Sequence, residues 1–285
     1  MRFHFSMAKY NQENIDQEVI NDFGNEWDRY NQNDNNVDLD EAFKQYFHIF
    51  PSEFFNTKKI GFDAGCGSGR WAKYIAPKVK KLYCIEPSEK AIKVAKNNLK
   101  FLDNCVFECC SINSSKIENE TMDFGYCLGV LHHIPDTKNA LLSCTEKLKK
   151  GSPFLLYMYY NFDNKPYWFK LIWLFTDLFR KFMCRLPFNL KLYLSKVIAI
   201  FIYFPLAKLS QLIESLGINV TNIPLSDYRR KSFYFMSTDA LDRFGTKLEK
   251  RFSKVEIISL MKKCGLHSIE FSKSTPFYVA IGYKK

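Results

Sequence analysis

The chain has 285 residues, of which 47% are hydrophobic and 25% are charged. This composition is typical of a globular protein and excludes a largely disordered chain. The net charge of +11 suggests an anionic partner, but residues 1–50 carry ten acidic and four basic side chains, so the positive charge belongs to the rest of the chain. A basic isoelectric point therefore does not identify the whole protein as a binder of nucleic acid.

The nine cysteines indicate the compartment rather than a site. Their number is odd, they lack the paired spacing of a zinc site, and several, such as Cys84 and Cys127, lie in apolar runs where cysteine is a small buried hydrophobe. We expect no metal and a reducing cytoplasm. Residues 1–9 contain no apolar stretch long enough for a signal peptide, which agrees with that expectation.

Residues 1–56 are predicted to form an acidic helical segment. Phe43, Tyr46, Phe47 and Phe50 follow helical spacing, which predicts a helix there. Trp27 and Tyr30 lie one helical turn apart. Packing against the core is the favoured interpretation for this pair, and a lid over a ligand is the alternative.

Residues 57–160 alternate between short apolar runs and amphipathic runs. Strands are expected at 60–62, 82–85, 105–109, 124–128 and 154–160, and helices at 70–76, 89–99 and 139–148. Strict alternation predicts right-handed crossovers and a parallel sheet with helices on both faces.

The alternation stops at residue 161, and residues 161–250 are predicted to be a helical insertion. Thirteen aromatic residues fall within 161–210, and the amphipathic pattern around Trp168 and Phe175 predicts a helix. The apolar run at 197–204 is flanked by Lys196 and Lys208 and interrupted by Pro205, so we expect it to be too short to span a membrane. Residues 251–285 return to the core pattern, with a helix at 254–264 and an antiparallel pair of strands at 268–272 and 277–283.

A glycine-rich turn, Asp63-Ala64-Gly65-Cys66-Gly67-Ser68-Gly69, follows the first strand and precedes a helix. Glycines at alternate positions let the main chain approach a ligand closely. The dinucleotide fingerprint needs a third glycine where this chain has Arg70, which disfavours a nicotinamide oxidoreductase. Glu86 ends the second strand, where an acid can accept hydrogen bonds from ribose hydroxyls.

Together with Leu128-Gly129-Val130-Leu131-His132-His133-Ile134-Pro135, this turn resembles the class I S-adenosylmethionine-dependent methyltransferases, and most closely the small-molecule enzymes of quinone and surface-glycan biosynthesis. The resemblance covers about residues 57–160 and 252–285. It implies a Rossmann-like α/β fold with a seven-stranded, mostly parallel sheet whose last strand is antiparallel. The segment 236–252 also resembles an uncharacterised bacterial subgroup of methyltransferases.

The resemblance also implies S-adenosyl-L-methionine as cofactor and assigns residues to it. Asp63, Gly65 and Gly67 would hold its methionine end, with Cys66 in the same loop, and Glu86 would bind its ribose. Leu128 would line the cofactor pocket. The family often has an aspartate after the third strand to bind adenine, and here Ser111 takes that place.

Two features are candidates for the acceptor side. His132 and His133 follow the fourth strand at its carboxyl end, and either is a candidate catalytic base, with His133 preferred. The favoured alternative is that the two histidines order the turn before the next helix. The basic triplet Arg229, Arg230 and Lys231 is interpreted first as a solvated surface and second as a contact for an anionic substrate group.

The insertion has two interpretations. It can be a lid that forms the acceptor pocket, buried against the core or a second subunit, or its basic aromatic face, at 161–210, can contact an anionic membrane peripherally. The lid is favoured because helical aromatic stripes usually pack.

We therefore expect a cytoplasmic enzyme that methylates a small-molecule or lipid- or glycan-linked acceptor, preferably on oxygen. Association of this enzyme with a membrane is the alternative. A nucleic-acid methyltransferase and a non-catalytic module that binds S-adenosylmethionine are the alternatives. Nucleic acid is not the expected partner, because residues 129–133 do not match the Asp/Asn-Pro-Pro-aromatic motif and no RNA-binding module is recognisable. The sequence predicts no oligomeric state.

Overall fold

The computed structural model describes residues 14–31, 36–163 and 165–285. The expectation about a signal peptide rests on residues 1–9, which lie outside the described residues, as do Glu13 and Asp34 of the acidic segment. The description below concerns the described residues alone.

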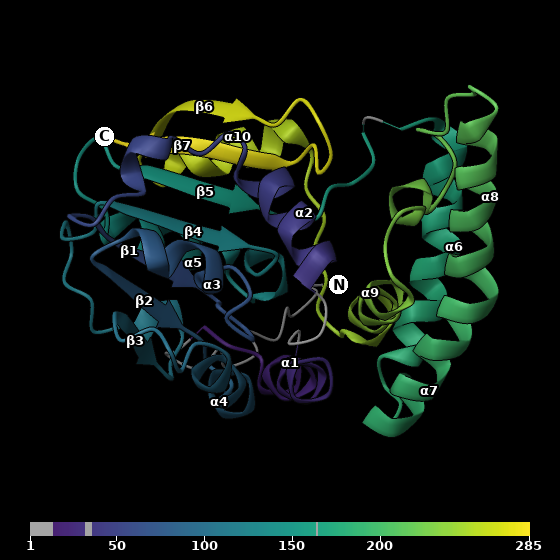
Figure 1. The fold of residues 1–285 in the computed structure, drawn as a ribbon, viewed down its shortest axis with the longest axis horizontal. Helices are drawn as coiled ribbons and strands as arrows, with labels where there is room; N and C mark the ends of the chain where they lie inside the picture. The colour runs from purple at the N-terminus through teal and green to yellow at the C-terminus, as the bar shows by residue number, and fades with distance from the viewer. Residues whose placement is uncertain (1–13, 32–35, 164) are drawn as a thin grey trace, which may run out of the picture.

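A seven-stranded sheet forms the centre of the protein, in the order β3-β2-β1-β4-β5-β7-β6 (Figure 1). All neighbouring pairs are parallel except those that β7 makes with β5 and β6. This topology confirms the predicted Rossmann-like fold with an antiparallel last strand. The strands are β1 (Ile60–Ala64), β2 (Lys81–Ile85), β3 (Cys105–Glu108), β4 (Phe124–Leu128), β5 (Pro153–Tyr157), β6 (Leu266–Phe271) and β7 (Val279–Lys284).

Helices cover both faces of the sheet, and two apolar cores result. One core contains side chains of α5 (Thr137–Glu146) and α10 (Lys254–Lys263). The other contains side chains of α2 (Asn36–Phe47), α3 (Ala72–Ile75) and α4 (Glu89–Asn98). The sheet is thus buried on both sides, as the continuous apolar runs of its central strands require.

Several expected boundaries were wrong. The strand expected at 154–160 is β5, which ends at Tyr157, and the helix expected at 139–148 is α5, which begins and ends two residues earlier. The helix expected at 70–76 is only one turn long, because Pro77 starts a 3-10 turn at Ala76–Lys78. The helix expected around 43–50 is α2, which begins earlier and ends at Phe47, while Phe50 is buried just after it. The strands expected at 268–272 and 277–283 are displaced by one or two residues, since β6 begins directly after Gly265, which adopts a positive φ of 82° at the end of α10.

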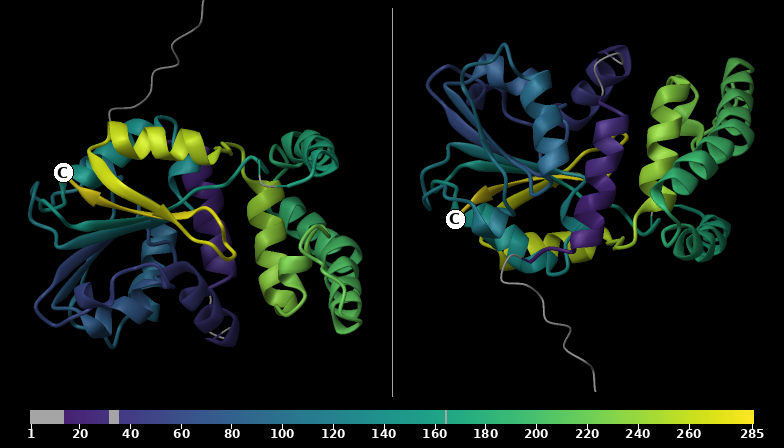
Figure 2. Two further views of the ribbon diagram at one scale, coloured as in Figure 1. Left: turned by 90° about the horizontal axis from the view of Figure 1, so that it is seen from above. Right: turned by 90° about the horizontal axis from the view of Figure 1, so that it is seen from below.

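The insertion is a separate helical layer beside the sheet. It contains α6 (Tyr167–Met183), α7 (Phe188–Ile198), α8 (Phe204–Ser215) and α9 (Phe233–Gly245). Figures 1 and 2 show α9 between the sheet and the outer helices α6, α7 and α8. α9 packs against α6, α7 and also α1 (Gln17–Arg29), so the N-terminal helix joins the insertion to the core.

The expectation that Pro205 interrupts the second apolar run was wrong. A π turn at Ala199–Tyr203 connects α7 to α8, and the result is one helix of 28 residues from Phe188 to Ser215. The hydrogen-bond register of the helix shifts in a π turn, which accommodates a residue that cannot donate. By length and composition alone this helix could cross a membrane.

Candidate active site

The glycine-rich turn lies at the carboxyl end of β1 and is attached to β2. The amides of Gly65 and Cys66 both donate to the carbonyl of Ile85, at 2.8 and 3.0 Å. Gly65 has a φ of 79° and Gly67 a φ of 53°. A Cβ on Gly67 would lie 3.0 Å from Nε1 of Trp27, so the turn requires glycine for its conformation and for its close neighbour.

Glu86 is held at the end of β2 by two main-chain donors. Its Oε2 accepts from the amide of Gly67 at 3.1 Å, and its Oε1 accepts from the amide of Ser88 at 3.0 Å. Burial raises the pKa of Glu86 to about 7, although both hydrogen bonds oppose that shift. A carboxylate has about four lone-pair sites, so each oxygen can accept a further hydrogen bond from a ligand diol.

A cavity opens in front of this turn, and we call it the loop cavity. The turn, the end of β4 and helix α1 contribute to its lining. Six of the seven predicted cofactor-binding residues lie in that lining: Gly65, Cys66, Gly67, Glu86, Ser111 and Leu128. The structure therefore brings together the residues that the resemblance assigned to the cofactor.

Asp63 is the seventh, and it lies behind the loop rather than in the lining of the cavity. It is 1% exposed, and neither carboxyl oxygen has a hydrogen-bond partner among the described residues. Burial raises the pKa of Asp63 to about 8, partly opposed by the nearby Tyr126. A buried acid without a partner is costly, and a cationic ligand above the loop would favour its ionised form. Direct contact between Asp63 and the cofactor stays a prediction.

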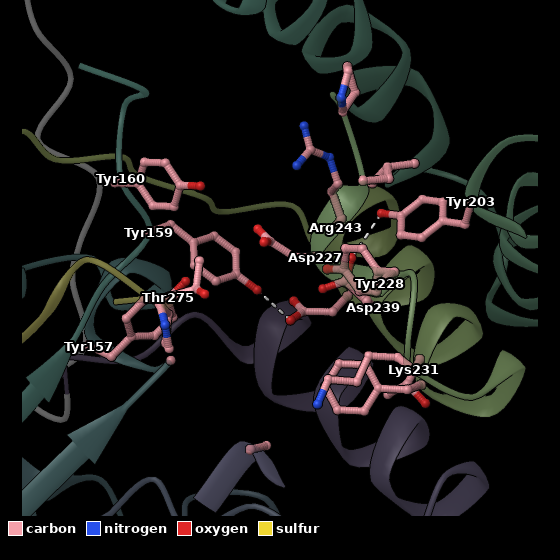
Figure 3. A pocket seen from close by; sticks show the side chains of 18 of the residues that line it. Tyr157, Tyr159, Tyr160, Tyr203, Asp227, Tyr228, Lys231, Asp239, Arg243 and Thr275 are labelled. Atoms are coloured by element: carbon pink, nitrogen blue, oxygen red, sulfur yellow. Dashed lines mark hydrogen bonds between the residues drawn. The ribbon is translucent and has the colours of Figure 1, made fainter. Parts of the chain in front are cut away.

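A second cavity of about 390 Å³ lies between the sheet and the insertion, and we call it the interdomain cavity. This volume is within the range of small-molecule sites. Figure 3 shows tyrosines from the core facing polar side chains of α9. Five of the six α9 residues that line the cavity recur at helical spacing, so one face of that helix points into it: Phe235, Thr238, Asp239, Asp242 and Arg243. Phe244 is the sixth.

Two tyrosine–aspartate pairs stand in the interdomain cavity, and Figure 3 labels Tyr159 of one pair and Tyr203 and Asp239 of the other. The hydroxyl of Tyr159 donates to Oδ2 of Asp242 at 2.6 Å, and the hydroxyl of Tyr203 donates to Oδ2 of Asp239 at 2.9 Å. Burial raises the pKa of both aspartates, partly offset at Asp242 by His133 and at Asp239 by hydrogen bonding to Tyr228 and Tyr203. A carboxylate with a raised pKa in a cavity is a stronger base than an exposed one.

The two cavities meet at the carboxyl end of β4. Five residues line both of them: Trp27, Arg70, Trp71, Leu128 and Gly129. A ligand in the loop cavity therefore contacts the same wall as a ligand in the interdomain cavity. Trp27 borders both, which agrees with the lid alternative, whereas Tyr30 is buried and packs edge-on against Tyr234.

The predicted histidines lie at this edge of the sheet but face inward. His132 is fully buried, its ring nitrogens have no partner among the described residues, and burial lowers its pKa. Its ring stacks on Tyr159 with centroids 3.9 Å apart. Nδ1 of His133 donates to the carbonyl of Leu248 at 2.6 Å, and Nε2 lies 3.8 Å from Oδ1 of Asp242. His133 lines the loop cavity, neither histidine lines the interdomain cavity, and a catalytic role for either stays a prediction.

The basic triplet is engaged in ion pairs. Arg229 and Arg230 bind Glu214 at 2.7 and 3.1 Å, and Lys231 binds Glu41 at 2.8 Å. Only Lys231 of the three lines the interdomain cavity. Sequence reasoning missed Asp242, although Asp239 and Asp242 lie three residues apart on one face of the predicted insertion and so indicate a polar lining.

This sheet order, with a glycine turn after β1 and an acid after β2, agrees with the predicted class I S-adenosylmethionine-dependent methyltransferase domain. The family model described as a methyltransferase domain matches residues 62–156 and agrees with this assignment. The predicted methyltransferase domain, with S-adenosylmethionine as its cofactor, is thereby confirmed for residues 62–156.

Known proteins that resemble the chain cover only part of it. It is 28% identical to the ubiquinone biosynthesis O-methyltransferase of Nitrosomonas europaea over 41% of this chain and 50% of that protein. It is 27% identical to the enzyme of the same name from Idiomarina loihiensis over 51% of this chain and 62% of that protein. The chain thus matches between half and two thirds of the length of these relatives.

One solved structure resembles nearly the whole chain. The complex between the Haloferax volcanii Trm112 methyltransferase activator and a putative methyltransferase contains a chain with a TM-score of 0.51 and 10% identity, which covers 90% of this protein and 96% of that chain. At this identity the likeness shows the fold alone.

Proposed function

We propose that this protein transfers the methyl group of S-adenosylmethionine, bound in the loop cavity, to a hydroxyl group of a small-molecule or lipid-linked acceptor in the interdomain cavity. The observation that supports this most strongly is the wall shared by the two cavities at Leu128 and Gly129. Methyl transfer needs donor and acceptor to meet in line, and adjoining cavities provide that proximity.

The chain's own residues would hold the cofactor as follows. The bare main chain at Gly65 and Gly67 admits its methionine portion, and Glu86 accepts hydrogen bonds from its ribose hydroxyls. Ser111 and Leu128 line the rest of the loop cavity. When bound, the cofactor supplies a methyl group on a positively charged sulfur.

Asp242 is the group best placed to take the acceptor's proton. Its side chain is 24% exposed in the interdomain cavity, and its pKa is raised by burial. The hydroxyl of Tyr159 fixes the orientation of one carboxylate oxygen, and His133 lies behind the other. The bound cofactor would supply the methyl group, and Asp242 would take the proton that the acceptor hydroxyl loses on methylation.

The names of the relatives support the oxygen acceptor. Both are called ubiquinone biosynthesis O-methyltransferases, and the proposal extends small-molecule O-methylation to this chain. We place the enzyme in a reducing cytoplasm, because none of the nine cysteines forms a disulfide.

The test is incubation of the purified protein with methyl-labelled cofactor and cell extract separated into lipid, glycan, small-molecule and RNA fractions. We expect label in the lipid, glycan or small-molecule fraction with the native protein, and none with Asp242→Asn, which should still bind S-adenosylhomocysteine. Label in the RNA fraction alone would contradict the acceptor class. Absence of turnover with every fraction would favour a non-catalytic module.

A further inference from the structure

The outer helices of the insertion expose an unusually apolar surface, which we call the outer face. It consists of the exposed apolar side chains of α6 and of the Phe188–Ser215 helix. Phe175 and Leu178 of α6 are 76% and 69% exposed, and Phe201 and Leu212 of the second helix are 73% and 60% exposed. Many large apolar side chains exposed on one layer of a protein mark an interaction site.

The opposite sides of these helices are already occupied. Met183, Ala199 and Tyr203 pack with α9 in a separate apolar core. Lys191 is buried and binds Asp22 of the N-terminal segment at 2.7 Å, and Tyr203 binds Asp239. The 28-residue helix cannot cross a bilayer while these contacts persist, so it would lie along a surface instead.

Charge on the outer layer is strongly positive. Residues 165–225 contain eight lysine and arginine side chains and two acids, Asp177 and Glu214. Both acids are neutralised, Asp177 by Arg180 and Lys181, and Glu214 by Arg229 and Arg230.

Four cations of this layer form no ion pair within the described part of the chain: Lys170, Arg185, Lys196 and Lys208. All four are exposed or half-buried, and Lys208 contacts Gln211. Unpaired positive charge beside exposed apolar side chains fits an anionic surface with an apolar interior. A symmetric dimer through the same face would oppose like charges, which is unfavourable.

We propose that the outer face docks on the surface of an anionic phospholipid bilayer. Its aromatic and aliphatic side chains enter the boundary between headgroups and acyl chains, and its cations contact the headgroups. Tyr167 and Trp168, exposed at the start of α6, suit the interfacial level where amphipathic rings gather.

The docking surface also reaches the acceptor site. Ile172 and Ile202 are 43% and 47% exposed, and both line the interdomain cavity. The apolar end of that cavity therefore lies beside the docking surface, and an amphiphilic acceptor can pass from the bilayer into it. This second step rests on the proposed function, whereas docking does not.

Sedimentation with vesicles tests the docking. The full chain is mixed with vesicles of phosphatidylcholine alone or with phosphatidylglycerol added, at low and at high salt. We expect binding to the anionic vesicles, weakened by salt, and about tenfold weaker binding of the double variant Phe175→Glu/Leu178→Glu. Lys208→Gln should lower binding about fivefold, from about 1 kcal/mol for one basic residue at the surface.

The matched control is Phe101→Glu/Val255→Glu, which changes two side chains of 86% and 75% exposure outside the insertion. This variant should bind vesicles normally. Calorimetric titration with S-adenosylhomocysteine should be unchanged in both double variants, which separates failure of docking from failure of the cofactor assignment.

Equal binding to neutral and anionic vesicles, or no binding to either, overturns the proposal. So does sedimentation velocity that shows a dimer which Phe175→Glu/Leu178→Glu converts into a monomer. Retained cofactor binding with lost vesicle binding in that variant supports it.

Discussion

Replacement of Glu86 by glutamine tests how the loop cavity recognises its ligand. Both oxygens of Glu86 already accept from main-chain amides, at 3.1 Å from Gly67 and 3.0 Å from Ser88. In glutamine, an NH2 group replaces one of the two carboxylate oxygens. That group would face a main-chain amide that also donates, and it could not accept a hydrogen bond from a ribose hydroxyl. A hydrogen bond to a charged group contributes about 1.5–3 kcal/mol, so we expect S-adenosylhomocysteine to bind roughly 10- to 100-fold more weakly.

The same residue predicts a pH dependence. The pKa of Glu86 is raised to about 7 in the ligand-free protein, so the carboxylate is protonated below that pH. Because ribose hydroxyls favour the ionised form, affinity should fall as pH drops below about 7, by up to about tenfold per pH unit. Calorimetric titration across this range should show the decline in the native protein and a flat profile in Glu86→Gln.

The control is Glu89→Gln, which changes an exposed glutamate in the first turn of α4. It should leave affinity and pH profile unchanged. If Glu86→Gln bound the ligand as tightly as the native protein and kept its pH profile, the assignment of Glu86 to the ribose would be refuted.

Three further predictions concern the turn, the acceptor site and stability. Gly67→Val should abolish S-adenosylhomocysteine binding, because a Cβ there would press on Trp27, while circular dichroism and thermal unfolding should show a folded protein. The control Gly217→Ala, at another glycine of positive φ but with open space around it, should bind the ligand normally. Asp242→Asn should lower kcat by about 10²–10⁴-fold and Tyr159→Phe by less, with cofactor affinity retained; native turnover in Asp242→Asn would remove its role as base. Because the pKa of Glu86 is raised in the ligand-free fold, the unfolded chain releases this proton at lower pH than the folded chain. The free energy of unfolding should therefore fall by about 3 kcal/mol as pH rises from 4.5 to about 7. Denaturant unfolding of Glu86→Gln should lack this pH-dependent loss of stability.

Local patterns predicted the core well. Each buried strand is a short apolar run, and the turn from Gly65 to Gly69 needs positive φ at three glycines, so sequence alone indicated which turn lines the loop cavity. Asp63 shows the limit of that reasoning, since its position in the motif was evident while its burial behind the loop depends on the packing of β1 and β4 around Tyr126.

The acceptor side depends on contacts between distant segments. Tyr159 and Asp242 are 83 residues apart and meet only because α9 packs across the edge of the sheet. His132 follows a strand end, which made it a candidate base, yet the fold buries its ring against Tyr159. Pro205 was read as a helix breaker, because a π turn, which depends on tertiary packing, has no reliable sequence signal.

A crystal structure of the protein with S-adenosylhomocysteine tests the central claim most directly. We predict the ligand in the loop cavity, with its ribose hydroxyls on Glu86, its amino-acid portion over Gly65 and Gly67, and its sulfur directed past Leu128 and Gly129 toward the interdomain cavity. A ligand bound elsewhere, or in the loop cavity with its sulfur directed away from Asp242, would contradict the account.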